Sequence, residues 1–196
     1  MFRSILILGL GLLAQATIIA SPVADLIQRQ DGEDLPIVTY DGPLYRMSPE
    51  EYKNMTDAME NGDDWFVPDE VPRVEMKPGM MLDLGGGTGT SLEARSGYRQ
   101  INVYFQRSCP ADSYIGGAAN FGCGGVCIFY NVPLLSAWLG QQFASNPKPT
   151  ANMYPNRSCG GSYHQKIGIW SGLTQGCSNA DGCCGSWQSF YAYYDC

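Results

Sequence analysis

Cysteine is absent from the first 108 residues of this 196-residue chain, glutamate is absent after Glu93, and histidine occurs once, at His164. A hydrolase commonly pairs a base with an acid, often His with Glu. The C-terminal half therefore offers few residues for such chemistry, and we expect no catalytic residues. No apolar run beyond residue 20 reaches the roughly 20 residues that a membrane-spanning helix needs.

Basic residues are also scarce, and the charge is divided unevenly. Residues 21–95 hold 16 Asp or Glu against 6 Lys or Arg, whereas residues 96–196 hold 3 Asp against 5 Lys or Arg. The net charge of −7 therefore comes from the first half. Because the second half is nearly neutral, nucleic acid and anionic membranes are not expected as partners.

The first twenty residues have the composition of a secretory signal peptide. Arg3 gives a positive start, residues 4–13 are apolar or small, and Ala14-Gln15-Ala16 fits a cleavage site. We therefore expect residues 1–20 to be removed and the protein to be secreted to the extracellular space, with no membrane anchor.

The cysteines predict disulfide bonds, because they are even in number and follow a secretory signal. The possible pairings number roughly a hundred, and the sequence does not choose among them. A metal site using Cys123, Cys127 and His164 is the alternative, but an oxidising compartment works against thiolate ligands. We expect no metal, no cofactor, and disulfides at Cys109, Cys123, Cys127, Cys159, Cys177, Cys183, Cys184 and Cys196.

Residues 21–95 are acidic, cysteine-free and rich in Pro, Gly and Met. This composition favours weak order. One helix is expected there, from Ser48 to about Glu60, because Ser48-Pro49-Glu50-Glu51 has the form of a helix N-cap followed by proline at the first helical position. The run Gly85–Gly89 predicts a flexible tether.

The tether leads to Leu92-Glu93-Ala94-Arg95. In this layout the chain resembles the fungal secreted cysteine-rich effectors and toxins whose pro-segment ends in Leu-x-x-Arg and is cut by a kexin-type protease. The resemblance, carried by Leu92 and Arg95, implies a pro-segment over residues 21–95 and a mature domain over residues 96–196. If no cleavage occurs, residues 21–95 form an acidic linker.

Residues 96–196 predict a small α+β domain, mostly antiparallel sheet with one helix, stapled by disulfides. The helix is expected over Leu134–Ala144, where apolar residues recur at helical spacing after Pro133. Runs of aromatic and β-branched residues predict strands over Gln100–Gln106, Val126–Val132, Lys166–Trp170 and Ser186–Tyr194.

The aromatic C-terminal strand is the candidate binding surface. Trp187, Tyr191 and Tyr193 would fall mainly on one strand face, where they could stack on sugar rings or contact a protein. The run Cys183-Cys184-Gly185-Ser186-Trp187 resembles the hevein-type chitin-binding module, although the next cysteine of that module has no counterpart here. Burial of both strand faces would explain the same aromatic residues.

Two further features concern modification and catalysis. Asn54 and Asn156 begin N-glycosylation sequons, which require exposed loops. His164 lies near Ser162 and Ser171, a set that a small hydrolase could use.

Three functions are therefore considered. The first is a monomeric, non-enzymatic secreted effector or toxin-like protein that binds an unknown host or competitor target. The second is an extracellular protein that binds chitin or another cell-wall glycan through the aromatic strand. The third is a small secreted hydrolase that uses His164.

Overall fold

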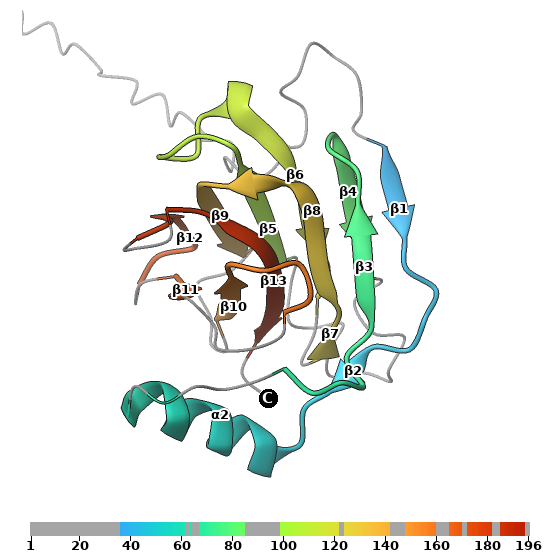
Figure 1. The fold of residues 1–196 in the computed structure, drawn as a ribbon, viewed down its shortest axis with the longest axis vertical. Helices are drawn as coiled ribbons and strands as arrows, with labels where there is room; N and C mark the ends of the chain where they lie inside the picture. Colours follow the sequence, from blue (N-terminus) through green and yellow to red (C-terminus); the bar gives the residue numbers. More distant parts are fainter. Residues whose placement is uncertain are drawn as a thin grey trace, which may run out of the picture.

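The computed structural model describes residues 36–61, 63, 67–84, 99–121, 124–141, 148–159, 165–169, 172–181 and 185–194. Two β-sheets pack face to face as a sandwich, and helix α2 (Pro49–Asn61) lies below the strands in Figure 1. The expected mostly sheet fold with disulfide staples is confirmed for the described residues, and their one α-helix is α2, in the acidic half of the chain.

The first sheet has six strands. Its first two pairings, β1 with β4 and β4 with β6, are parallel, and the others are antiparallel. The strand order is β1 (Ile37–Thr39), β4 (Met80–Asp83), β6 (Tyr114–Ala119), β5 (Arg99–Tyr104), β9 (Ser136–Gln141) and β12 (Gln175–Asn179).

The second sheet has five strands, and only its β3–β8 pairing is parallel. The strand order is β11 (Gln165–Gly168), β10 (Pro149–Tyr154), β13 (Trp187–Tyr194), β8 (Cys127–Leu134) and β3 (Arg73–Met76). A short ribbon joins β2 (Tyr45–Arg46) to β7 (Gly124–Gly125), and a 3-10 turn, η2, covers Ala111–Ser113.

The main core lies between the two sheets. Alternate residues of each strand point inward, as a period of two requires. Ile101 and Val103 of β5 are fully buried, and so are Phe190 of β13 and Ile128 of β8. The two strands β11 and β12 are left at neighbouring edges of the sandwich, one in each sheet.

Helix α2 begins where the sequence predicts. The backbone N–H of Ser48 donates to the Glu51 carboxylate at 2.7 Å, and the backbone N–H of Glu51 donates to Ser48 Oγ at 3.2 Å. This reciprocal pair is a capping box. The helix packs through the fully buried Met55 into a second cluster, which includes Tyr154, Tyr191 and Tyr193 of the five-stranded sheet.

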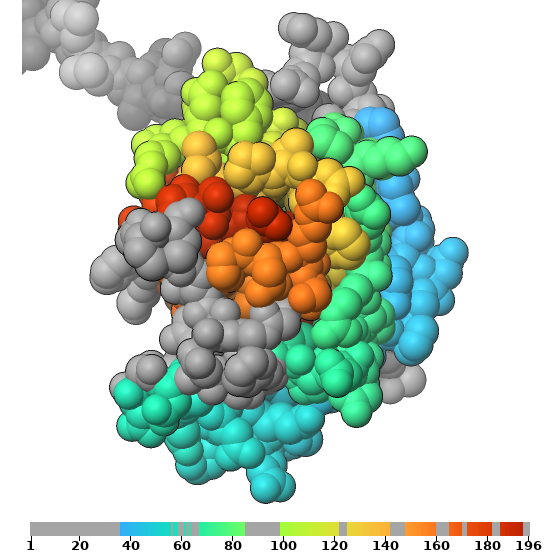
Figure 2. All heavy atoms as spheres, viewed as in Figure 1, coloured from blue at the N-terminus to red at the C-terminus, as the bar shows by residue number. Residues whose placement is uncertain are grey.

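Residues 36–84 are part of the sandwich, so the weak order expected of residues 21–95 does not hold for them. They supply β1 and β4 to one sheet and β3 to the other. Leu82 is 1% exposed, and Val71 is 1% exposed. Figure 2 shows these residues, coloured blue to green, covering the bottom and one side of the molecule. Met76, Leu82 and Leu84 of this stretch complete the core, whereas acidic residues such as Asp69 and Glu75 face solvent.

The helix expected over Leu134–Ala144 is wrong. The end of β8 and the whole of β9 occupy this stretch as far as Gln141, and residues 142–144 lie outside the described residues. Strand β9 pairs with β5 on one side and with β12 on the other. Ala137 and Leu139 point into the core, so the apolar residues fit a period of two as well as a helical one. Hydrogen bonding to β5 on one side and to β12 on the other then favours a strand over a helix.

The four predicted strands are confirmed as β5, β8, β11 and β13, with ends shifted by at most two residues. Strands β6, β10 and β12 were not predicted. They are rich in Gly, Ala, Ser, Asn or Pro and lack the run of aromatic and β-branched residues that marks the other four.

Candidate functional site

Trp187, Phe190, Tyr191 and Tyr193 of β13 are buried, so both faces of this strand are covered. Trp187 and Tyr191 are 0% exposed, and Tyr193 is 2% exposed. Trp187 lies in the core between the sheets, whereas Tyr191 and Tyr193 pack in the cluster that includes Met55. In this fold they offer no surface for stacking on a sugar ring.

The tyrosines of this second cluster have a structural role. The Tyr193 hydroxyl donates to Asn152 Oδ1 at 3.1 Å, and the rings of Tyr191 and Tyr193 stack with centroids 5.6 Å apart. Burial, followed by the neighbouring tyrosines, raises the pKa of Tyr193 well above its ordinary value. Its hydroxyl therefore stays protonated and acts as a hydrogen-bond donor.

Two disulfides are formed among the described cysteines. Cys109 and Cys177 join the segment after β5 to β12, with 6.2 Å between their Cα atoms. Cys127 and Cys159 join β8 to the segment after β10, with 6.0 Å between their Cα atoms. Both bridges have ordinary Cα separations. The other four cysteines lie outside the described residues: Cys123, Cys183, Cys184 and Cys196.

The bond from Cys127 to Cys159 also bears on the metal site considered from the sequence. The Cys127 sulfur is already bonded and cannot serve as a thiolate ligand. Within the described ranges, no three His, Cys, Asp or Glu side chains are grouped to hold a metal ion.

The remaining predicted sites are the two glycosylation sequons, the processing residues and His164, and the structure describes only the sequon asparagines. Asn156 lies in the segment after β10, partly exposed, and its Oδ1 accepts a hydrogen bond from the Ser158 N–H at 3.1 Å. Asn54 is exposed but lies on helix α2 rather than in a loop. The processing residues Leu92 and Arg95, together with His164, lie outside the described residues.

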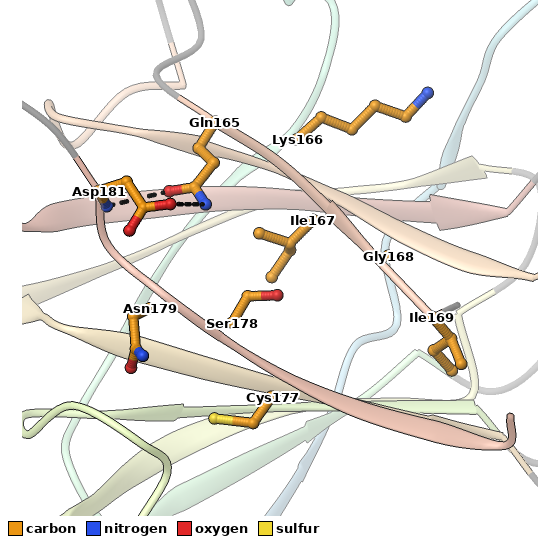
Figure 3. A pocket seen from close by; sticks show the side chains of 9 residues that line it. All are labelled: Gln165, Lys166, Ile167, Gly168, Ile169, Cys177, Ser178, Asn179 and Asp181. Atoms are coloured by element: carbon orange, nitrogen blue, oxygen red, sulfur yellow. Dashed lines mark hydrogen bonds between the residues drawn. The ribbon is translucent and has the colours of Figure 1, made fainter.

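A hollow of about 560 Å³ lies between the edge strands β11 and β12, and we refer to it as the edge slot (Figure 3). It lies at the side of the sandwich where the edge strand of one sheet, β11, lies beside the edge strand of the other, β12. Its lining combines amide, hydroxyl and carboxylate side chains with two isoleucines. The lining residues are Gln165, Lys166, Ile167, Gly168, Ile169, Cys177, Ser178, Asn179 and Asp181.

One end of the edge slot is spanned by Gln165 and Asp181. The Gln165 Nε2 donates to Asp181 Oδ2 at 3.3 Å, and the Asp181 backbone N–H donates to Gln165 Oε1 at 3.2 Å (Figure 3). Toward the other end the strands converge. There the carbonyl oxygen of Gly168 lies 3.7 Å from the point that a Cβ on Gly176 would occupy.

Between these ends, Ile167 and Ser178 point toward one another across the slot, and Lys166 points away from it (Figure 3). Ile167 is 3% exposed and Ile169 is 7% exposed, so both isoleucines belong to the core behind the slot and leave little of their surface open to it. Asn179 ties the end of β12 to the segment after β5, because its Oδ1 accepts a hydrogen bond from the Ser108 N–H at 2.6 Å.

The disulfide of Cys177 also lies at the edge slot and joins β12 to Cys109. Ser108 and Cys109 both have positive φ angles, 71° and 52°, which are uncommon for residues other than glycine. The disulfide and the Asn179 contact together hold this segment against β12.

None of the residues lining the edge slot was predicted as a binding residue. The slot exists because two strands from different sheets end side by side, and this depends on the packing of the whole sandwich. Within the sequence of each strand, the polar residues have the pattern of an ordinary solvent-exposed edge strand.

The chain has no significant match among known protein families, curated proteins or solved structures. None of the helices in the described part of the chain is both long and apolar enough to cross a membrane.

Proposed function

We propose that this protein is a secreted, non-enzymatic effector or toxin-like protein that binds a target on a host or competitor cell. The observation that carries the proposal is the edge slot. Its volume of about 560 Å³ falls within the ~300–1,000 Å³ typical of ligand sites. Its amide, hydroxyl and carboxylate side chains provide both hydrogen-bond donors and acceptors.

Two features support secretion. The first twenty residues have the pattern of a signal peptide. Disulfides such as Cys109–Cys177 persist in oxidising compartments and are rare in the cytosol. We propose that the protein reaches the extracellular space as a monomer and carries a glycan at Asn156.

We also propose cleavage after Arg95, as the Leu-x-x-Arg layout implies. Residues 36–84 would then remain as a second chain, because they contribute strands to both sheets. The product would be a two-chain domain with no released pro-segment.

The second candidate is a glycan-binding protein. In that case the glycan would bind in the edge slot and not on the buried aromatic strand β13. Gln165, Ser178 and Asp181 are residue types that hydrogen-bond to hydroxyl groups. A hydrolase using His164 is the third candidate, and His164→Ala would leave any hydrolytic activity intact if that candidate is wrong.

Cell binding tests the proposal. The full chain, secreted from a fungal host and fluorescently labelled, is titrated onto plant, animal, fungal and bacterial cells and measured by flow cytometry. We expect saturable binding to at least one cell type, weakened by Ser178→Val in the slot. The matched control Thr39→Val on β1, at the opposite edge of the six-stranded sheet, should bind normally. No saturable binding to any cell type at micromolar concentration would contradict the proposal.

A further inference from the structure

Two consecutive residues of the acidic half contact both sides of the Cys127–Cys159 disulfide. The backbone N–H of Cys127 donates to the carbonyl oxygen of Pro72 at 2.7 Å, where β3 begins to pair with β8 (Figure 1). The Arg73 Nε donates to the carbonyl oxygen of Ser158 at 2.8 Å, and Ser158 immediately precedes Cys159. Pro72 and Arg73 therefore join the strand that carries one cysteine to the turn that carries the other.

The Arg73 side chain is fixed in the position from which it makes this contact. Its Nη1 donates to the carbonyl oxygen of Asp69 at 3.0 Å and to that of Val71 at 3.1 Å. Val71 is 1% exposed and belongs to the same buried cluster as both cysteines. The guanidinium thus spans from its own packed segment to the Ser158 carbonyl, a reach that the planar fork of arginine provides and the compact ammonium of lysine does not.

The turn that carries Cys159 needs such support. Cys159 has a φ angle of 48°, in the left-handed region that residues other than glycine rarely adopt. Its N–H donates to Ser189 Oγ at 3.1 Å, and Ser189 Oγ donates to the carbonyl oxygen of Asn156 at 2.6 Å. These contacts come from the cysteine-rich half, and Arg73 adds one from the acidic half. A conformation of this kind persists only when its surroundings hold it.

Correct pairing in a reduced chain is a demanding step, because its eight cysteines can pair in roughly a hundred ways. A disulfide oxidant such as oxidised glutathione first reacts with one cysteine thiolate, which gives a mixed disulfide and one free thiol. A second cysteine thiolate then attacks the protein sulfur of the mixed disulfide, forms the protein bond and releases the second thiol. The cysteine pair loses two electrons and two protons, which the oxidant takes up as it becomes two thiols. The second attack depends on how closely the two cysteines are held.

From these contacts we infer that the acidic half is an internal folding template, which selects Cys127 and Cys159 as a pair. Pro72 and Arg73 are its positioning residues, because they hold the backbone beside each cysteine and so bring the two within reach before the bond forms. The template acts in the uncut chain. This inference therefore depends neither on cell binding nor on cleavage after Arg95.

The other described disulfide provides an internal reference. The Cys109 N–H donates to Ser136 Oγ at 3.0 Å, and the Ser108 N–H donates to Asn179 Oδ1 at 2.6 Å. Cys177 lies on β12, which pairs with β9. These contacts are made within the cysteine-rich half, so loss of the template contact should leave the pairing of Cys109 with Cys177 unchanged.

Oxidative refolding of the full secreted chain tests the template. The protein is reduced in denaturant and diluted into a glutathione redox buffer, samples are alkylated at successive times, and peptide mass spectrometry measures how fast each bond appears. Arg73→Ala should slow the formation of Cys127–Cys159 roughly three- to tenfold, the effect of losing about one hydrogen bond. It should also raise the share of Cys127 that is bonded to other cysteines. The rate for Cys109–Cys177 should stay that of the natural protein.

Two further variants complete the test. Lys77→Ala is the matched control, because it removes an exposed cation just after β3, and it should leave both rates unchanged. Arg73→Lys keeps the charge but loses the fork, so it should also slow Cys127–Cys159, and it decides the case in which Arg73→Ala does not refold. If both bonds slow together, Arg73 stabilises only the fold as a whole, and the inference is overturned. A natural rate for Cys127–Cys159 in both Arg73 variants overturns it too.

Discussion

The side-chain amide of Asn152 donates a hydrogen bond to the sulfur of Met55, 97 residues earlier in the chain, with 3.5 Å between Nδ2 and Sδ. Asn152 lies on β10, and Met55 lies on helix α2 in the acidic half. The contact is buried and belongs to the cluster that joins the helix to the five-stranded sheet. The acidic half is thereby held to the cysteine-rich half by its own packing.

Truncation of Met55 should destabilise the whole domain. Met55 is 0% exposed, so Met55→Ala leaves a cavity and should lower the free energy of unfolding by about 2–5 kcal/mol. The control is Lys53→Ala on the same helix, which removes an exposed ion pair with Asp57 and should change the free energy of unfolding by less than about 1 kcal/mol. Urea unfolding followed by tryptophan fluorescence measures both. Equal effects of the two variants would show that α2 does not pack on the sheet.

The hydroxyl of Tyr193 also donates a hydrogen bond to the Asn152 side chain. Tyr193→Phe leaves the Asn152 oxygen buried without this donor and should cost about 1–3 kcal/mol in the free energy of unfolding. Tyr40→Phe is the matched control, because the Tyr40 hydroxyl donates to Pro43 O at an exposed site. If the Tyr193 variant is as stable as the Tyr40 variant, the buried hydrogen bond does not form.

The start of α2 should respond to acid. Hydrogen bonds from the Tyr45 hydroxyl, then from the Ser48 backbone and side chain, lower the pKa of Glu51 below its ordinary value of 4.5. A lowered folded-state pKa stabilises the protein above pH 4.5, and that contribution is lost as the pH falls through the folded-state pKa. Melting temperatures of the natural protein and Glu51→Gln should therefore differ at pH 6 and converge near pH 3. A difference that stays constant from pH 6 to pH 3 would contradict this assignment.

The two disulfides should differ in their access to reductant. Cys127 and Cys159 are both 0% exposed, whereas Cys177 is exposed on an edge strand. Thiol–disulfide exchange needs access to a sulfur atom, so dithiothreitol without denaturant should reduce Cys109–Cys177 first. Timed alkylation and peptide mass spectrometry follow each pair. Simultaneous reduction of both pairs would mean that the domain opens as a whole before either bond is reached.

Several elements could be predicted from local sequence because a local signal decides them. Helix α2 has its capping box, and β5 and β13 have aromatic and β-branched runs. Strand β9 could not, because Leu135, Trp138 and Leu139 satisfy a helical spacing and only the neighbouring strands decide the outcome.

Strand β6 was missed for a different reason. It contains Gly116 and Gly117, which weaken a strand signal. A Cβ on Gly117 would lie 2.0 Å from the carbonyl oxygen of Ile101, so the close approach of β5 requires glycine. The same residue that hides the strand in the sequence makes its packing possible.

The edge slot could not be predicted either. Gln165 lies on β11 and Asp181 follows β12, and the two residues meet only because these edge strands of different sheets lie side by side. The misreading of residues 36–84 is similar, since their average composition conceals the apolar residues that enter the core.

Residues 36–84 belong to the same folded domain as the cysteine-rich half, because they supply strands to both sheets. A recognition sequence for a site-specific protease, inserted between residues 84 and 99, allows the folded chain to be cut there. All eight cysteines follow residue 95, so no disulfide joins the two pieces. Native mass spectrometry after the cut should find both pieces in one complex, which separates only in denaturant. A cysteine-rich piece that is found alone and keeps the circular dichroism and melting temperature of the uncut protein would contradict the claim.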